Sequence, residues 1–286
     1  MQRIGETVNA REAFKAVPRK LFIPDEIFVP NDVGWLVPLR RSDDPERWHK
    51  YVAADDAIVT RTRFAPAIPA ELCDAATGRG VEATSSSSAP FIMARLIDAL
   101  ELQPGMRVLE IGTGTGYNAA VLARLLGAEN VISVEIDSVA ADRARSALRE
   151  AGYPVRVVTG DGEDGYPPAA PYDRIIVTAS VHTVPMTWVE QTRPGGMILA
   201  PWAPTFHPDW PLCRLTVRAD GSAAGRCIGP APFMPLRAQR VRAHAVDEAE
   251  TKWTEAGKPD CTRYGVSVTP EGQQQVWFDS PDNVIG

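Results

Sequence analysis

The fold is decided by residues 107–135, which read RVLEIGTGTGYNAAVLARLLGAENVISVE. Mostly apolar residues fill 107–111, which predicts a buried strand, and closely spaced glycines follow at 112–116. Residues 117–126 place apolar side chains at helical spacing, and 131–135 form a second apolar run. The stretch therefore predicts a strand, a tight turn, a helix and a second strand.

The same alternation continues on both sides of this stretch. The further expected elements are a helix from Pro90, a helix at 138–151, strands at 155–159 and 174–178, a helix at 187–192 and a strand at 197–200. Each parallel crossover needs a segment, usually a helix, that returns the chain to the same edge of the sheet. We therefore expect an α/β fold of the Rossmann-like kind, with an open, mostly parallel sheet covered by helices on both faces.

The residues before this core are less regular. Apolar positions in 10–22 predict a helix that Pro18 bends or ends. Prolines and Asp-rich turns interrupt 23–63, which predicts irregular structure with a few short strands. The four serines at 85–88 are typical of a turn.

The residues after the core predict a hairpin followed by a tail without a regular pattern. Residues 213–218 and 225–228 flank an Ala-Asp-Gly-Ser turn and predict an antiparallel hairpin. The tail from 237 onward is polar and shows no clear period.

Length and composition indicate one large globular domain with additions. The chain has 286 residues, of which 44% are hydrophobic and 23% charged. Its formal net charge is -6, so no basic field is expected for a nucleic-acid backbone or an anionic membrane surface. Residues 1–6 lack the apolar run of a signal peptide, and we expect a cytoplasmic protein.

The cysteines do not indicate a metal site or a disulfide framework. Cys73, Cys213, Cys227 and Cys261 are scattered, and no pair has the Cys-x-x-Cys spacing. We expect four reduced thiols and no bound metal.

The glycine turn and two acidic residues predict a nucleoside site. Gly112, Gly114 and Gly116 let the backbone approach a ligand closely, but Tyr117 stands where a dinucleotide fingerprint needs its third glycine. Pyrophosphate binding is therefore disfavoured, and no lysine follows the turn as a P-loop requires.

Acidic residues follow the next two strands. Glu135 ends the second strand, where a carboxylate in this architecture accepts hydrogen bonds from ribose hydroxyls. Asp161, between Gly160 and Gly162, follows the third strand and could accept from an adenine amine. Each has an ordinary structural alternative, a surface Glu and an Asp-Gly turn, but together with the glycines they would meet at one edge of the sheet.

Several stretches resemble the protein-L-isoaspartate O-methyltransferase family. They cover most of residues 10–237 and read AFKAVPRKLF (13–22), SAP (88–90), VLEIGTGTGYNAAVLA (108–123), GDG (160–162), YDRIIVTA (172–179), PGG (194–196) and FMPL (233–236). The glycine motif is shared by many methyltransferases, whereas the VPR, SxP and DRIIVTA elements are much more specific to this family.

The resemblance implies S-adenosylmethionine (SAM) as the methyl donor and a peptide carboxylate as the acceptor. It implies three parts: an N-terminal substrate-side segment (1–84), a SAM-binding methyltransferase core (85–237) and a C-terminal extension (238–286). The donor contacts expected are Glu110, Gly112, Thr113, Gly114, Gly116, Tyr117, Glu135, Ile136, Asp161, Gly162 and Thr178.

The acceptor side would be formed by Ser87, Ser88, Ala179, Ser180 and His182, with Ser88 and Thr178 nearest the chemistry. The structural alternative for Ser88 is a helix N-cap before Pro90. His182 is expected to be an ordinary loop residue rather than a base, because a carboxylate is already ionised at neutral pH.

Four functions fit these residues. Extra sequence between Phe64 and Val81, the tail after Arg237 and the 180–185 loop resemble the branch associated with ribosomal peptide tailoring, in which an esterified aspartate closes to aspartimide. We slightly prefer that activity to general isoaspartyl repair. A small-molecule methyltransferase and a non-catalytic peptide-binding relative are the remaining alternatives.

Overall fold

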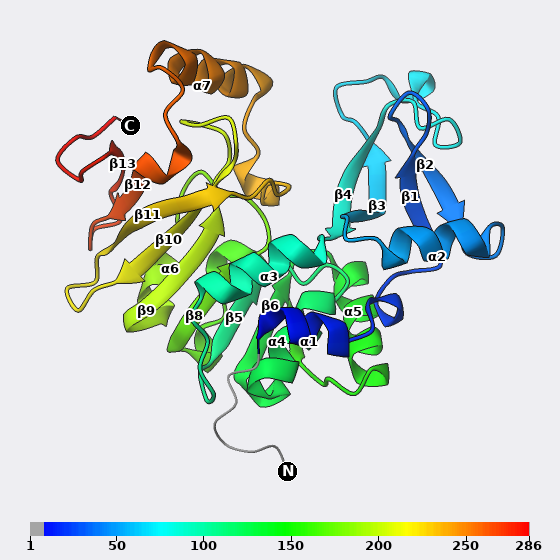
Figure 1. The fold of residues 1–286 in the computed structure, drawn as a ribbon, viewed down its shortest axis with the longest axis horizontal. Coiled ribbons are helices and arrows are strands. Elements are labelled where there is room, and N and C mark those ends of the chain that lie inside the picture. The colour runs from blue at the N-terminus through cyan, green and yellow to red at the C-terminus, as the bar shows by residue number, and fades with distance from the viewer. Residues whose placement is uncertain (1–8, 286) are drawn as a thin grey trace.

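The computed structural model describes residues 9–285. Residues 1–6, in which no signal peptide is expected, lie outside this range. Two sheets organise the described chain, with four and nine strands (Figure 1).

The nine-stranded sheet contains the predicted parallel core. Its order is β13-β12-β11-β10-β9-β8-β5-β6-β7. The last five strands of this order, β9, β8, β5, β6 and β7, pair in parallel. These strands are β5 (Val108–Ile111), β6 (Val131–Glu135), β7 (Arg156–Thr159), β8 (Tyr172–Val177) and β9 (Thr192–Pro201). The helices between them are α4 (Tyr117–Leu126), α5 (Ser138–Glu150) and α6 (Met186–Gln191), and α3 (Pro90–Ala99) precedes β5. The α/β prediction is confirmed.

Both faces of this sheet are buried, as a parallel sheet requires. Ile176 of β8 packs with α3 and α4 in one hydrophobic cluster. Its neighbours Ile175 and Val177 pack with Trp188 of α6 in the cluster on the other face. Side chains of a strand alternate between faces, so each core strand divides its apolar residues between two helical layers.

Register brings the predicted site residues to one edge of the sheet. Ile111 lies beside Val134 on one side and Val177 on the other. The next residues along each strand, Gly112, Glu135 and Thr178, therefore leave the sheet together at its carboxyl edge.

The N-terminal segment is more regular than its sequence predicts. Its helices are α1 (Ala10–Ala16) and α2 (Pro45–Ala53), and its strands are β1 (Glu26–Pro30), β2 (Leu36–Arg40), β3 (Ile58–Phe64) and β4 (Val81–Ser87). The strands form an antiparallel sheet, β2-β1-β3-β4, with its own core around Trp48. The few short strands expected in 23–63 are present, but the expectation that the segment is otherwise irregular is wrong. Pro30 ends a strand and Pro38 lies in an edge strand, where prolines are tolerated.

Three of the four serines belong to a strand and not to a turn. Ser85, Ser86 and Ser87 pair with β3, so β4 continues across the expected segment boundary at residue 84. Cross-strand pairing outweighs the local turn preference of serine here. Helix α1 ends at Ala16, and a short 3-10 turn at Arg19–Leu21 follows Pro18, which ends the helix as predicted.

The C-terminal residues extend the large sheet. The predicted hairpin is β10 (Pro211–Val217) and β11 (Ala223–Pro230), and it is followed by α7 (Ala243–Glu255), β12 (Tyr264–Val268) and β13 (Gln274–Phe278). The tail therefore has structure that no period revealed: β12 pairs with β11 and buries Tyr264, Val266 and Val268.

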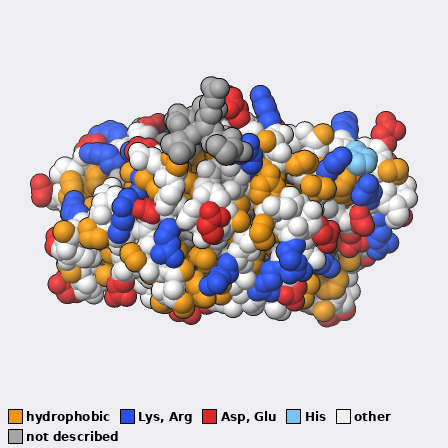
Figure 2. Space-filling view, turned by 90° about the horizontal axis from the view of Figure 1, so that it is seen from below, with side chains coloured by type: hydrophobic (Ala, Val, Ile, Leu, Met, Phe, Trp, Pro, Cys, Tyr) orange, Lys and Arg blue, Asp and Glu red, His pale blue; other side chains and the backbone are white. Residues whose placement is uncertain are grey.

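Charged side chains of both signs share the surface with apolar ones (Figure 2). On the face shown in Figure 2, acidic, basic and apolar side chains are interspersed. No helix within residues 9–285 is long and apolar enough to cross a membrane.

Candidate functional site

A cavity of about 720 Å³ opens at the carboxyl edge of the parallel strands. Strands β3 and β4 of the small sheet and the segment 232–240 complete its walls. The predicted site residues that line it are Ser87, Ser88, Gly112, Thr113, Gly114, Tyr117, Glu135, Ile136, Asp161, Gly162, Thr178 and Ala179. A second cavity of about 750 Å³ beneath α1 shares Phe91 and Tyr117 with it but contains none of these glycines or acids.

The glycine turn has a backbone that other residues rarely adopt. Gly112, Gly114 and Gly116 have φ angles of +95°, +54° and +85°. A Cβ on Gly112 would lie 2.7 Å from the hydroxyl oxygen of Thr178, and one on Gly114 would lie 3.3 Å from the carbonyl oxygen of Ser86. Glycine is therefore needed both for the turn and for the close approach of neighbouring backbone.

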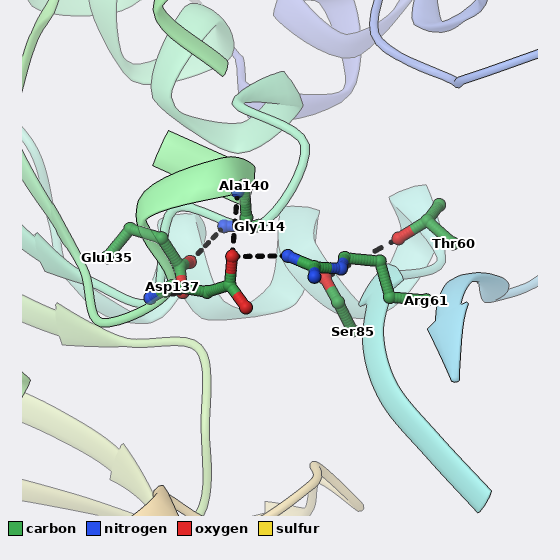
Figure 3. Close-up of polar contacts among 7 residues, drawn as sticks. All are labelled: Thr60, Arg61, Ser85, Gly114, Glu135, Asp137 and Ala140. Atoms are coloured by element: carbon green, nitrogen blue, oxygen red, sulfur yellow. Dashed lines mark hydrogen bonds and ion pairs between the residues drawn. The ribbon is translucent and has the colours of Figure 1, made fainter. Parts of the chain in front are cut away.

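Glu135 holds this turn from the adjacent strand (Figure 3). One carboxylate oxygen accepts a hydrogen bond from the Gly114 amide at 2.8 Å, and the other accepts from the Asp137 amide at 3.0 Å. Each carboxylate oxygen has a second lone pair, so the group can still accept from a ligand hydroxyl.

Asp137 joins the core to the small sheet. Its side chain caps α5 by accepting from the Ala140 amide at 3.0 Å, and it forms an ion pair with Arg61 of β3 (Figure 3). Arg61 also lines the cavity. Two segments far apart in sequence are thus tied together beside the glycine turn.

Asp161 and Gly162 form the wall that follows β7. Asp161 is exposed and accepts from the Glu163 amide at 3.0 Å. A Cβ on Gly162 would lie 2.5 Å from Ile111, so only glycine lets this loop reach the sheet edge.

Glu110 lies beneath the turn and outside the cavity lining. Its fully buried carboxyl group accepts from Asn118 Nδ2 at 2.7 Å and from Ser133 Oγ at 2.5 Å. Burial raises the pKa of Glu110 to about 7. The group supports the turn from below, whereas a direct donor contact was expected.

Asn118 carries the clearest sign that the cavity is built for a polar ligand. Asn118 lines the cavity, and its buried Oδ1 has no hydrogen-bond partner among residues 9–285. A buried acceptor without a partner is costly, and a ligand amine or hydroxyl would relieve that cost. With the glycine cradle and Glu135, this atom fits the expected nucleoside-bearing methyl donor.

Ser87 and Ser88 are held at the cavity by Arg19. The buried guanidinium donates to Ser87 Oγ at 3.2 Å, to the Ser87 carbonyl at 2.9 Å and to the Ser88 carbonyl at 3.1 Å. The N-cap of α3 is Ala89, so the helix-cap alternative for Ser88 is wrong. Arg19 belongs to the VPR element, yet the sequence alone did not assign it a role.

The amino-terminal motif is positioned by Tyr117. Its ring contacts those of Phe14 and Phe22, with centroids 5.5 and 5.6 Å apart, and its hydroxyl donates to the Phe14 carbonyl at 3.2 Å. Tyr117 therefore links the glycine turn to the segment that carries Arg19.

Thr178 and Ala179 line the cavity, and two predicted neighbours do not. The Thr178 hydroxyl donates to the Gly112 carbonyl at 2.6 Å, which fixes the turn. Ser180 is fully buried, and its backbone bonds to Met234 and Leu236. The His182 amide donates to Gln239 Oε1 at 2.8 Å, away from the cavity lining.

Gly116 is also absent from the lining. It is the N-cap of α4, and a Cβ there would lie 3.3 Å from Ala144 and Leu148 of α5. Gly116 therefore allows α4 and α5 to pack closely. Within residues 9–285 no group of three or more His, Cys, Asp or Glu side chains is arranged to hold a metal ion.

Comparison with known proteins agrees with this geometry. The family described as Protein-L-isoaspartate(D-aspartate) O-methyltransferase matches residues 48–240. A protein-L-isoaspartate O-methyltransferase of Ignicoccus hospitalis is 38% identical over 227 residues, which cover 79% of this chain and 87% of the relative. Another, from Methanoculleus marisnigri, is 44% identical over 153 residues, which cover 53% of this chain and 67% of the relative.

A solved protein-L-isoaspartate O-methyltransferase shares the fold over nearly the whole chain. The TM-score is 0.64 at 23% identity, and the match covers 96% of each chain. On the matched family region and the similarity to the Ignicoccus enzyme, the chain belongs to the protein-L-isoaspartate O-methyltransferase family of SAM-dependent carboxyl O-methyltransferases.

Proposed function

We propose that this chain methylates the free carboxylate of isoaspartyl residues in proteins and peptides, as a repair-type enzyme. The observation that carries the proposal is that the glycine turn, Glu135 and the Ser87-Ser88 pair line one cavity. Family membership supplies the reaction type, and the cavity supplies a place where donor and acceptor can meet.

The donor side would be formed by the carboxyl ends of the parallel strands. Gly112 and Gly114 leave backbone exposed, Glu135 offers free lone pairs for ribose hydroxyls, and Asn118 offers a buried acceptor. When bound, SAM supplies an electrophilic methyl group on a sulfonium. The chain's task on this side is to hold the nucleoside and orient that methyl group.

The acceptor side would be formed by Ser88, Ala179 and the end of β4. Arg19 fixes the backbone of this corner, so the Ser88 side chain has a defined position at the cavity. The acceptor carboxylate is ionised at neutral pH and needs no base. The position of His182, outside the cavity lining, agrees with this.

Relatives favour repair over the peptide-tailoring activity that we preferred from the sequence. The additions that suggested tailoring lie within a fold shared over 96% of a solved chain named protein-L-isoaspartate O-methyltransferase. Additions of this kind therefore do not distinguish the two activities, and the curated relatives carry the repair-type name.

The test uses labelled SAM and three peptides of one sequence with isoaspartate, aspartate or asparagine at a single position. We expect a base-labile methyl ester on the isoaspartyl peptide at a rate at least tenfold above the aspartyl peptide. Absence of ester on every peptide would overturn the proposal. Ester formed mainly on the aspartyl peptide would instead support tailoring, and turnover of a metabolite alone would support the small-molecule alternative.

A further inference from the structure

Arginines gather where the small sheet and the segment 232–240 meet across the cavity. Arg61, Arg63, Arg237 and Arg240 all line it, although the chain as a whole has a net charge of -6. Arg61 is paired with Asp137 beside the glycine turn. The other three define what we call the arginine rim: Arg63, Arg237 and Arg240.

The arginine rim has more positive than negative charge. Arg63 and Arg240 share a single carboxylate, Glu82, at 2.5 and 3.1 Å. Arg237 is exposed and has no ion-pair partner among residues 9–285. The arginine rim thus has three guanidinium groups and one paired carboxylate, which leaves an excess of positive charge at this side of the cavity.

Four acids line the cavity: Asp56, Glu135, Asp137 and Asp161. Glu135 binds the backbone of the glycine turn, Asp137 pairs with Arg61, and Asp161 accepts from its own loop after β7. Asp56 lies beside Arg19, whose guanidinium donates to the main-chain carbonyl of Asp56 at 2.8 Å. Among residues 9–285, none of these four carboxylates forms an ion pair with the arginine rim.

Strand β4 offers an edge beside the rim. It is the last strand of the small sheet, and six consecutive residues, 83–88, line the cavity. Because side chains of a strand alternate between faces, a lining of consecutive residues includes the backbone edge itself. An exposed strand edge is a template for an added extended segment.

We propose that the substrate segment lies extended along β4 and that the arginine rim selects segments with acidic residues flanking the methylated residue. This inference rests on the proposed function. It adds the class of substrate: acidic, extended stretches of polypeptide, whose carboxylates pair with guanidinium groups by charge-assisted hydrogen bonds.

The experiment compares three isoaspartyl peptides that differ only in their flanks, which carry four Glu, four Gln or four Lys residues. We expect kcat/KM to be about tenfold higher for the Glu peptide than for the Gln peptide, and lowest for the Lys peptide. The difference should lie in KM and should shrink in 0.5 M NaCl, because salt screens exposed charges.

Arginine variants test whether the arginine rim causes the preference for acidic flanks. Arg237→Gln and Arg240→Gln should each lower the Glu-to-Gln ratio of kcat/KM at least threefold. Arg40→Gln, which removes an exposed arginine paired with Glu26 outside the cavity, is the matched control and should keep the wild-type ratio.

The outcomes separate this inference from the proposed function. If no peptide is esterified, the proposed function fails. If all three peptides are esterified equally well, or if the rim variants keep the wild-type ratio, the repair-type activity stands and the selection of acidic segments is wrong.

Discussion

At the scale of single residues, the buried Glu110 makes the free energy of unfolding depend on pH. The carboxyl group is fully buried beneath the glycine turn, and its pKa rises from an ordinary 4.5 to about 7 because burial disfavours the charged form. The pKa in the folded chain therefore lies above that in the unfolded chain. As pH rises, the unfolded state releases this proton first, so the contribution of Glu110 is complete below about pH 4.5 and is lost as pH approaches 7.

We expect Glu110→Gln to remove this pH dependence. The shift corresponds to a loss of about 3 kcal/mol of unfolding free energy between pH 4.5 and 8 in the wild type. Glutamine keeps the shape of the side chain and cannot ionise, so the difference in unfolding free energy between wild type and variant should change between pH 4.5 and 8. Urea unfolding at several pH values measures it. Parallel curves for the two proteins would contradict the prediction.

Arg19 acts as a positioning residue for Ser87 and Ser88. Besides these serines, its guanidinium reaches the carbonyl oxygens of Ala54 and Asp56 at 2.9 and 2.8 Å. We expect Arg19→Lys to lower the unfolding free energy by about 2 kcal/mol, since an ammonium cannot reach so many acceptors. Thermal and urea unfolding measure the loss.

A matched control is Arg40→Lys, at an exposed ion pair with Glu26. It should change the unfolding free energy by less than about 0.5 kcal/mol. Equal effects of the two substitutions would show that the Arg19 contacts contribute little.

At the scale of elements, the turn between β5 and α4 requires glycine for two separable reasons. Gly112→Ala would place a Cβ on a residue whose φ is +95°, and that Cβ would lie 2.7 Å from the Thr178 hydroxyl oxygen. Gly152→Ala would place a Cβ on a residue whose φ is +80°, but no other atom would lie within 4 Å of that Cβ. Both should lose about 1 kcal/mol of stability to backbone strain. Only Gly112→Ala should weaken S-adenosylhomocysteine binding, by more than tenfold in calorimetry.

This pair of variants can fail in two informative ways. If Gly112→Ala binds the nucleoside like wild type, the turn is not the donor cradle. If Gly152→Ala also loses affinity, strain alone accounts for the effect and the close approach to Thr178 is irrelevant.

The Arg61–Asp137 pair joins β3 to the start of α5 beside the glycine turn. The two side chains are 31% and 28% exposed, so we expect a coupling energy of about 1 kcal/mol that falls in 0.5 M NaCl. A double-mutant cycle of Arg61→Gln and Asp137→Asn measures it, and asparagine keeps the cap of α5. The more exposed Arg40–Glu26 pair should couple less. Zero coupling at low salt would mean that the contact does not join the two parts.

At the scale of the whole molecule, the C-terminal residues complete the large sheet. Strand β12 pairs with β11 and buries Val266 and Tyr264 in the same cluster as the core strands. We expect a chain ending at Val241 to expose the edge of β11 and to aggregate. Size-exclusion chromatography and thermal unfolding against the full chain test this. A truncated chain with the wild-type elution volume and Tm would show that the extension is dispensable for folding.

The sequence predicted the parallel core because its signals are local. The run at 107–111 is apolar, the glycines at 112–116 need unusual φ angles, and Glu135 follows at the next strand end. Parallel register then brings these residues to one edge, as expected. Residues Ser180 and His182 are near in sequence to this edge, but their backbone bonds to 232–240 take them away from the cavity, which no local pattern indicated.

The small sheet was missed because its signals conflict. Pro30 and Pro38 oppose strand structure locally, and the serines at 85–87 favour turns, yet pairing between distant strands outweighs both. The roles of Arg19 and Arg61 were missed for the same reason: their partners lie 68 and 76 residues away in the chain.

By itself, therefore, the sequence determined the α/β core and the family, and it predicted which glycines and acids meet at the carboxyl edge of the sheet, since these depend on periodicity and on residue types at neighbouring strand ends. Only the tertiary structure decided which arginines face the cavity, what holds Ser87 and Ser88, and that the tail completes the sheet. Those features are contacts between segments far apart in the chain, and no local pattern encodes which distant partner a side chain or a strand edge will meet.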